Sequence, residues 1–155
     1  MTFKLSQRSK DRLEGVHPDM AATVRQAIAL SNIDFGVSEG VRTLGRQRQL
    51  VARGASQTLK SKHLLQEDGY GHAVDLFAYI DGNVDWTLSL YDDIADAMKE
   101  AASITGAKLR WGAAWQIDDI TSWQGTMEEA MNEYIDLRRS QGRRPFIDGP
   151  HFELM

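Results

Sequence analysis

The chain has 155 residues, a formal net charge of −4 and no cysteine. This length is ordinary for one domain and suffices to bury a hydrophobic core, so the fold requires neither disulfide bonds nor an oxidising compartment. No sustained basic run is present, so we expect no binding to nucleic acid, whose phosphates select clustered Lys and Arg.

The organisation of the chain predicts a single domain spanning residues 1–155. No internal repeat, low-complexity tract or Pro/Ser-rich linker interrupts it. The N-terminus lacks the apolar segment of a signal peptide, and no apolar run reaches membrane-spanning length. We therefore expect a monomer that makes no stable membrane association and stays in the cytoplasm unless another factor releases it.

The first third of the chain predicts two helices, a strand and a third helix. Residues 8–13 suit a short helix, and Pro18 suits the first position of a second helix, whose apolar residues recur at helical spacing. Residues 33–39 alternate as a half-buried strand does, and residues 43–53 predict a basic, partly amphipathic helix.

The rest of the chain predicts three further strands and two helices. The strongest strand signal is 73–80, stopped by the turn residues 81–83, and shorter strands are expected at 108–112 and around His151. Residues 88–104 form an amphipathic pattern whose acidic side we interpret as a solvated face. A capping box at 126–129 predicts a helix to about residue 139, which is a candidate to cover a cleft.

Two short stretches combine histidines with carboxylates. The sequence reads Ser-Lys-His at 61–63, Gly-His-Ala-Val-Asp at 71–75 and Asp-Gly-Pro-His-Phe-Glu at 148–153. Two imidazoles and one carboxylate supply three ligands to Zn²⁺ and leave a fourth position for water, which is the arrangement of catalytic zinc sites. The same ligands accept other divalent ions, so the residues alone do not select zinc.

Asp75 stands inside an apolar strand. A carboxylate in such a place is costly unless it is paired or binds a metal, which favours a role as ligand. The alternative is a buried aspartate that is hydrogen-bonded to the backbone.

These motifs resemble those of the D,D-carboxypeptidase/L,D-endopeptidase family of zinc peptidases, which cut peptidoglycan stem peptides and include phage endolysins. The matching residues are Ser61, His63, Gly71, Ala73, Asp75, Asp148 and His151. The resemblance implies an α+β fold of the Hedgehog/D,D-peptidase type, in which a small antiparallel sheet carries the zinc site and helices flank it. It also implies that His63, Asp75 and His151 hold Zn²⁺.

One departure from the family lies between His63 and Gly71. Residues 64–70 stand where the family has a two-residue gap, and the turn-forming Glu-Asp-Gly at 67–69 favours a loop insertion. If these residues do not form a loop, His72 replaces His63 as ligand. Otherwise we expect His72 to line the cleft near the substrate.

The resemblance also implies roles for residues around the metal. Asp148 is expected to be the catalytic base, with Glu153 as the competing candidate, which we rank as the partner of a ligating imidazole. Arg42 is expected to stabilise the oxyanion, the alternative being a solvated arginine before a helix. Ser61 is expected to hydrogen-bond the substrate or a ligand. Trp111 is expected to lie on the cleft wall and contact the substrate, the alternative being a place in the core.

The function implied is hydrolysis of an amide bond in a peptidoglycan stem peptide, most simply between L-Ala and D-Glu, by a phage endolysin that a holin releases to the cell wall. We expect no separate wall-binding module. Two alternatives remain: a D-Ala-D-Ala carboxypeptidase or dipeptidase, and a non-catalytic, metal-stabilised domain that binds the wall.

Overall fold

The computed structural model describes residues 2–56 and 58–155. Its helices are α1 (Gln7–Arg12), α2 (Pro18–Leu30), α3 (Leu44–Ala52), α4 (Leu88–Thr105) and α5 (Met127–Ser140), with a short 3-10 turn η1 (Ile120–Ser122). Its strands are β1 (Asp34–Glu39), β2 (Ala73–Ile80), β3 (Asn83–Asp85), β4 (Leu109–Trp111) and β5 (His151–Leu154). All helices and strands predicted from sequence are present within a few residues of their expected bounds, and β3 is an addition.

The strands form one antiparallel sheet with β2 at its centre. The order is β1-β2-β5-β4, and β3 pairs with the far end of β2 through a hairpin. Because β3 and β5 pair with different parts of β2, both fit beside it: β3 with residues 78–80 and β5 with residues 73–75. The expected α+β fold with a small antiparallel sheet is confirmed.

The two faces of this sheet have different chemistry, because side chains alternate along each strand. Val74 and Leu76 of β2, like Phe152 of β5, are fully buried in the core. Asp75 and His151 lie one position away and therefore point to the opposite face. The apolar face anchors the sheet, and the other face is free to carry polar side chains.

Helices α2 and α4 pack on each other and close the apolar core. Met20 and Val24 of α2 and Ile94 and Met98 of α4 are completely buried, as their helical spacing predicts. Gly106 ends α4 in the left-handed conformation, with φ 83°. Among the described residues, no helix combines the length and the apolar character needed to cross a membrane.

Two expectations about the polar side of α4 and about α5 are wrong. Asp92, which we placed on a solvated face, is only 4% exposed. The N-terminus of α5 packs against this side of α4, where Asp96 accepts a hydrogen bond from Met127 N at 2.8 Å. Helix α5 therefore extends the core beside α4 and contributes no residue to the cleft described below.

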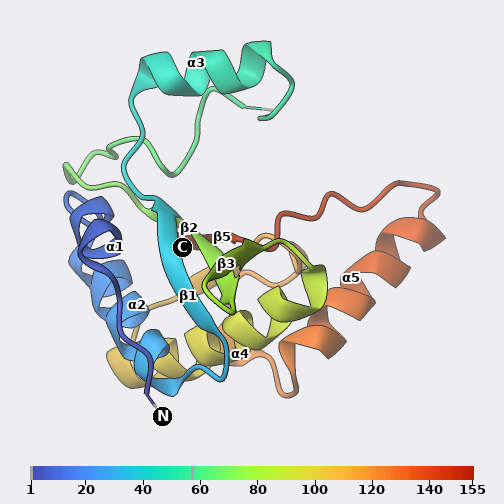
Figure 1. Cartoon of the computed structure of the whole chain (residues 1–155). Coiled ribbons are helices and arrows are strands. Elements are labelled where there is room, and N and C mark those ends of the chain that lie inside the picture. The colour runs from blue at the N-terminus through green and yellow to red at the C-terminus, as the bar shows by residue number, and fades with distance from the viewer. Residues whose placement is uncertain (1, 57) are drawn as a thin grey trace.

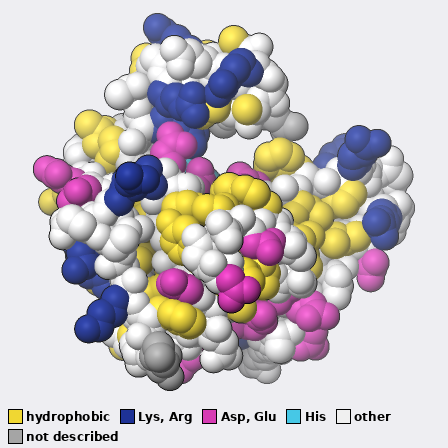
Figure 2. Space-filling model, in the orientation of Figure 1, with side chains coloured by type: hydrophobic (Ala, Val, Ile, Leu, Met, Phe, Trp, Pro, Cys, Tyr) yellow, Lys and Arg dark blue, Asp and Glu magenta, His cyan; other side chains and the backbone are white. Residues whose placement is uncertain are grey.

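Helix α3 stands apart from the other helices, above the sheet in Figure 1, whereas α4 lies below it. Figure 2 shows the same arrangement as a lobe rich in Lys and Arg, separated from the main body by a hollow. The polar face of the sheet thus looks towards α3.

Candidate active site

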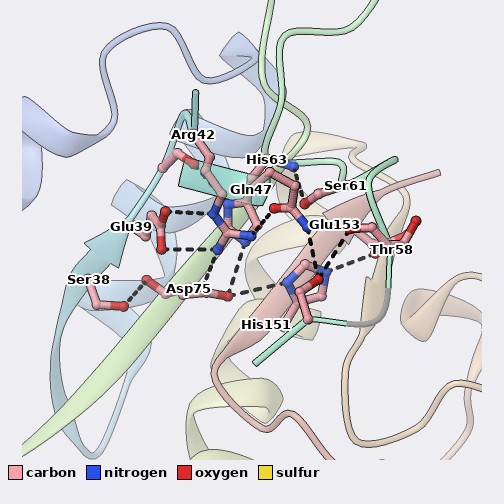
Figure 3. Close-up of polar contacts among 12 residues, drawn as sticks. Ser38, Glu39, Arg42, Gln47, Thr58, Ser61, His63, Asp75, His151 and Glu153 are labelled. Atoms are coloured by element: carbon pink, nitrogen blue, oxygen red, sulfur yellow. Dashed lines mark hydrogen bonds and ion pairs between the residues drawn. The ribbon is translucent and has the colours of Figure 1, made fainter. Parts of the chain in front are cut away.

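Three metal-ligating side chains meet on the polar face of the sheet. Asp75 lies in β2, His151 is its direct partner on β5, and His63 comes from the loop that precedes β2. Asp75 Oδ1 lies 3.3 Å from both His63 Nε2 and His151 Nδ1. The close-up in Figure 3 shows Asp75 and His151 facing each other from neighbouring strands, with His63 beside them.

This geometry fits a tetrahedral cation. Ligand atoms at bonds of about 2.0–2.1 Å in a tetrahedral site lie about 3.3 Å from one another, the separation that Asp75 Oδ1 keeps from both histidines. His63 Nε2 is buried and has no hydrogen-bond partner among the described residues. Burying an unpaired ring nitrogen is unfavourable, so its position beside a carboxylate and a second imidazole indicates a metal ligand.

Each histidine is oriented by a second contact. His63 Nδ1 donates to the Gly40 carbonyl oxygen at 2.8 Å, which leaves Nε2 with its lone pair. His151 Nε2 donates to Glu153 Oε1 at 2.8 Å, which turns Nδ1 towards Asp75. Such partners fix the tautomer and orientation of ligating histidines. Glu153 therefore has the contact that we expected of it.

The ionisation of the cluster favours binding of a cation. Burial disfavours the Asp75 carboxylate, but its close contacts with His151 and His63 outweigh burial and hold the Asp75 pKa well below its usual value. Burial alone would lower the pKa of His151, yet its contacts with Asp75 and Glu153 raise that pKa to about 10. Without a metal, His151 carries a proton that a divalent cation would displace.

Residues 64–70 form a loop, as predicted, and His63 stays in the centre. Gly69 has φ 84° and its N–H donates to Gln66 O at 2.9 Å, which closes the turn. The chain then returns at Gly71, whose N–H donates to Gly15 O at 3.0 Å. His72 lies outside the cleft lining and pairs instead with Asp68 at 2.7 Å. The structure thus brings His63, and not His72, to Asp75 and His151.

Arg42, which follows the end of β1, lies beside this cluster of polar side chains. Its Nε and Nη2 donate to the Glu39 carboxylate at 2.6 and 3.0 Å, and its Nη1 donates to Gln47 at 2.7 Å. Nη2 also lies 3.5 Å from Asp75 Oδ2. The Arg42 side chain is 9% exposed, so it is a fixed positive charge at the edge of the ligand cluster and not a solvated arginine.

Asp148 lies beside the cluster at the turn that leads into β5. Its N–H donates to Gly112 O at 2.8 Å, and its carbonyl accepts from His151 N at 3.1 Å. A Cβ on residue 112 would overlap the Asp148 carbonyl, so this close approach requires glycine there. Burial and the neighbouring Asp75 charge raise the pKa of the Asp148 carboxyl.

These residues line one cleft of about 680 Å³ between the sheet and the α3 lobe. It is lined by the three candidate ligands with Asp148 and Arg42, by the segment after α3 and by Trp115 and Phe146. Ser61 also lines the cleft, and its hydroxyl accepts a hydrogen bond from His63 N at 3.1 Å. The cleft is the hollow visible below the α3 lobe in Figure 2.

The chain matches a known protein family along its whole length. The sequence model of the family described as phage L-alanyl-D-glutamate peptidase matches residues 1–155. The chain belongs to the phage L-alanyl-D-glutamate peptidase family. The family resemblance stated from the motifs is therefore confirmed.

Two relatives of this family member match over nearly their whole length. It is similar to the L-alanyl-D-glutamate peptidase of Escherichia phage T5, with 32% identity over 159 residues that span 100% of both chains. It is also similar to the crystal structure of the Serratia marcescens L-Ala D-Glu endopeptidase ChiX, with 35% identity and a TM-score of 0.71. That likeness covers 99% of this chain and 91% of ChiX.

Trp111 does not line the cleft of this family member. Trp111 is completely buried, stacks on Phe152 and donates from Nε1 to Gly149 O at 2.8 Å. It therefore holds the turn after Asp148 from the side of the hydrophobic core. Trp115, the second tryptophan of the same segment, lines the cleft and packs against His151, with ring centroids 5.7 Å apart.

Sequence reasoning missed Gln47 and Glu39. Gln47 is completely buried and joins Arg42 to the segment after α3 through hydrogen bonds to Ser56 and Thr58. Glu39 is the cross-strand partner of Asp75 and holds Arg42. Gln47 stands three residues from both Leu44 and Leu50, so a polar residue at an otherwise apolar position of α3 was a usable signal. No local pattern marks Glu39, because its role depends on strand register.

Proposed function

We propose that the protein is a zinc-dependent endopeptidase that hydrolyses the amide bond between L-Ala and D-Glu in peptidoglycan stem peptides. The observation that carries this proposal is the buried, unpaired His63 Nε2, which lies 3.3 Å from Asp75 Oδ1 on the floor of an open cleft. The likeness to the L-alanyl-D-glutamate peptidase of phage T5 and to the L-Ala D-Glu endopeptidase of Serratia marcescens supports the choice of bond.

His63, Asp75 and His151 are the residues that would hold the zinc ion. A zinc ion bound there would supply Lewis-acid chemistry, polarising the scissile carbonyl and lowering the pKa of a water molecule. The three residues line the cleft, which leaves room on its side for a water molecule or a substrate. Two imidazoles and a carboxylate suit zinc by ligand type.

Asp148 acts as the general base and then as the general acid. It takes a proton from the attacking water and gives it to the amine nitrogen of the leaving D-Glu. A raised pKa suits this exchange, because a base works best when its pKa approaches the working pH. Glu153 is the weaker candidate because its carboxylate already accepts from His151 Nε2 at 2.8 Å.

Arg42 stabilises the negative charge that develops on the carbonyl oxygen. Four of the five N–H groups of its guanidinium face Glu39, Gln47 and Asp75 among the described residues, which fixes the group without reorganisation during the reaction. Ser61 contributes by holding His63 and by offering a hydroxyl to the substrate peptide. His72 lies outside the lining of this cleft and pairs with Asp68, so substrate binding is not assigned to it.

The proposal also implies where the protein resides and where it acts. As a phage lysin acting as one monomeric catalytic domain, it is expected to reside in the host cytoplasm and to reach the cell wall when a holin opens the membrane. Peptidoglycan stem peptides are then its partner, and neither nucleic acid nor a membrane is required.

Hydrolysis of defined peptides tests the function. The zinc-loaded protein is incubated with a stem peptide containing L-Ala-D-Glu and with one ending in D-Ala-D-Ala, each with and without chelator. Release of L-Ala from the first, lost with chelator and restored by zinc, is the expected result. Release of D-Ala would assign a carboxypeptidase, and a folded, zinc-loaded protein that cuts neither peptide would indicate a binding domain.

A further inference from the structure

We propose that the chain holds a second binding site for a divalent transition-metal ion, formed by His17, Asp68 and His72. These three residues, here named the loop-clip site, lie apart from the cleft and have no part in the proposed reaction. Their candidate ligand atoms lie within 4.8 Å of one another. Asp68 Oδ2 is 2.7 Å from His72 Nε2 and 3.9 Å from His17 Nε2.

The two histidines are held on rigid backbone. Val16 and Gly71 form a parallel bridge, and His17 N donates to Gly71 O at 2.9 Å. His72 N donates to Lys62 O at 2.7 Å. The imidazole rings stand nearly perpendicular, at 82°, with centroids 5.3 Å apart. Two imidazoles are therefore preorganised, and only the third ligand belongs to the loop.

Asp68 needs a small movement to complete the site. Its Oδ1 accepts from Tyr70 N at 3.0 Å, which orients Oδ2 towards the histidines. Ligand atoms around a tetrahedral ion are about 3.3 Å apart, so the present distances of 2.7 and 3.9 Å to the two Nε2 atoms fall on either side of that value. A shift of the carboxylate by roughly half an ångström equalises them.

The ligand set selects the chemical class of the ion. Two imidazoles with one carboxylate suit Zn²⁺, Co²⁺, Ni²⁺ or Cu²⁺. Calcium and magnesium prefer six or more oxygen ligands or retained waters, which this cluster does not offer. The side chains of His17 and Asp68 are 26% and 41% exposed, so water can complete the coordination.

A hydrogen bond that His17 already makes opposes metal binding at this site. The His17 Nδ1 atom caps α2 by accepting from Asp19 N at 3.1 Å, so the neutral ring carries its proton on Nε2. Coordination through Nε2 requires that proton to move to Nδ1, which ends the cap. Asp19 is exposed, so water replaces the lost acceptor, and a metal–imidazole bond outweighs one exposed cap hydrogen bond.

The loop-clip site would tie the inserted segment to the start of α2. The loop leaves the proposed ligand His63 and returns at Gly71, beside His72, which stands four residues after Asp68. A cation there links residues 64–70 to the start of α2, and it restricts the segment adjoining His63. This consequence does not depend on which bond the enzyme cuts.

Zinc stoichiometry of the full chain tests the site. Isothermal titration with zinc chloride is performed on the metal-free wild type, on Asp68→Asn and His17→Gln, and on Glu67→Gln as a control in the same loop. We expect two equivalents for the wild type and Glu67→Gln, and a second equivalent at least about tenfold weaker in the other two variants. His151→Ala should lose the other equivalent and keep this one.

A signal at Asp19 separates this site from unspecific binding. On addition of the second equivalent, the Asp19 backbone amide resonance should shift, because its acceptor on His17 is withdrawn. One equivalent in the wild type overturns the proposal, as does a second equivalent that Asp68→Asn and His17→Gln both retain. Asp68→Asn lies on an exposed loop, so its result does not depend on whether His17→Gln folds.

Discussion

Asp75 and His151 are direct partners in the antiparallel pairing of β2 with β5, and their side chains meet with Oδ1 3.3 Å from Nδ1. The next residue along each strand is buried in the core, so a register slip of one position would turn both proposed ligands into the apolar interior. Packing of the apolar face therefore specifies the position of the proposed metal site on the other face, and the same strands build the core and this site.

Asp148→Asn tests the general base. The variant keeps the shape of the side chain but cannot accept a proton, so we expect kcat to fall by about 10²- to 10⁴-fold. Zinc content should be unchanged, because Asp148 is not one of the three proposed ligands. Asp118→Asn, at an exposed position, is the matched control. Loss of zinc in Asp148→Asn would instead make this residue a ligand.

Glu153→Gln tests the partner of His151. The carboxylate accepts from His151 Nε2 at 2.8 Å, and loss of its charge makes the imidazole a poorer ligand. We expect zinc affinity to fall by about 10- to 100-fold, with activity recovering at higher zinc. Competition with a chromogenic chelator measures the affinity, with Glu100→Gln as the control. Activity that excess zinc fails to restore would point to Glu153, not Asp148, as the base.

Arg42→Lys tests the fixed positive charge. A lysine cannot contact Glu39, Gln47 and Asp75 together as the planar guanidinium does. Loss of oxyanion stabilisation predicts a fall in kcat of about 10²-fold, with a smaller change in KM. Arg46→Lys on the exposed side of α3 should behave as the wild type. If Arg42→Lys lost zinc and kept the kcat of its zinc-loaded fraction, Arg42 would only position Asp75.

Asp92→Asn tests the buried acidic side of α4. Burial, followed by the charges of Asp93, Glu128 and Asp96, raises the pKa of Asp92 to about 7 from an ordinary value of 3.8. The folded state therefore binds this proton more tightly than the unfolded state, so Asp92 ionisation lowers stability as pH rises from 3.8 to about 7.

The asparagine variant removes this dependence. We expect it to be more stable than the wild type by at least about 1 kcal/mol near pH 8, with the difference fading near pH 4. Urea unfolding at both pH values measures it. An unchanged or larger advantage at the lower pH would contradict the assignment to Asp92.

The sequence predicted the site where local pattern and chemistry agreed. Alternation along 73–80 placed Asp75 away from the apolar side chains, and the turn residues at 67–69 predicted the loop that keeps His63 in place. Helix limits were also predictable, since the Thr126 capping box and Gly106 act through their immediate neighbours.

Features that depend on distant contacts were not predictable. Trp111 and Trp115 belong to one short segment, and only the stacking on β5 decides that Trp111 is buried and Trp115 lines the cleft. Asp92 was misplaced because α5, far along the chain, covers the polar side of α4. Strand β3 was missed because its three residues are mostly exposed and carry no apolar alternation.

The most direct test of the account is the identity of the bond cut in intact peptidoglycan. Purified Gram-negative peptidoglycan is digested with the zinc-loaded wild type and with Asp148→Asn, each with and without chelator, and the released fragments are analysed by mass spectrometry. The account predicts new amino termini on D-Glu, which disappear with chelator and in Asp148→Asn. Fragments that instead show loss of D-Ala, or no cleavage by a folded, zinc-loaded wild type, would contradict it.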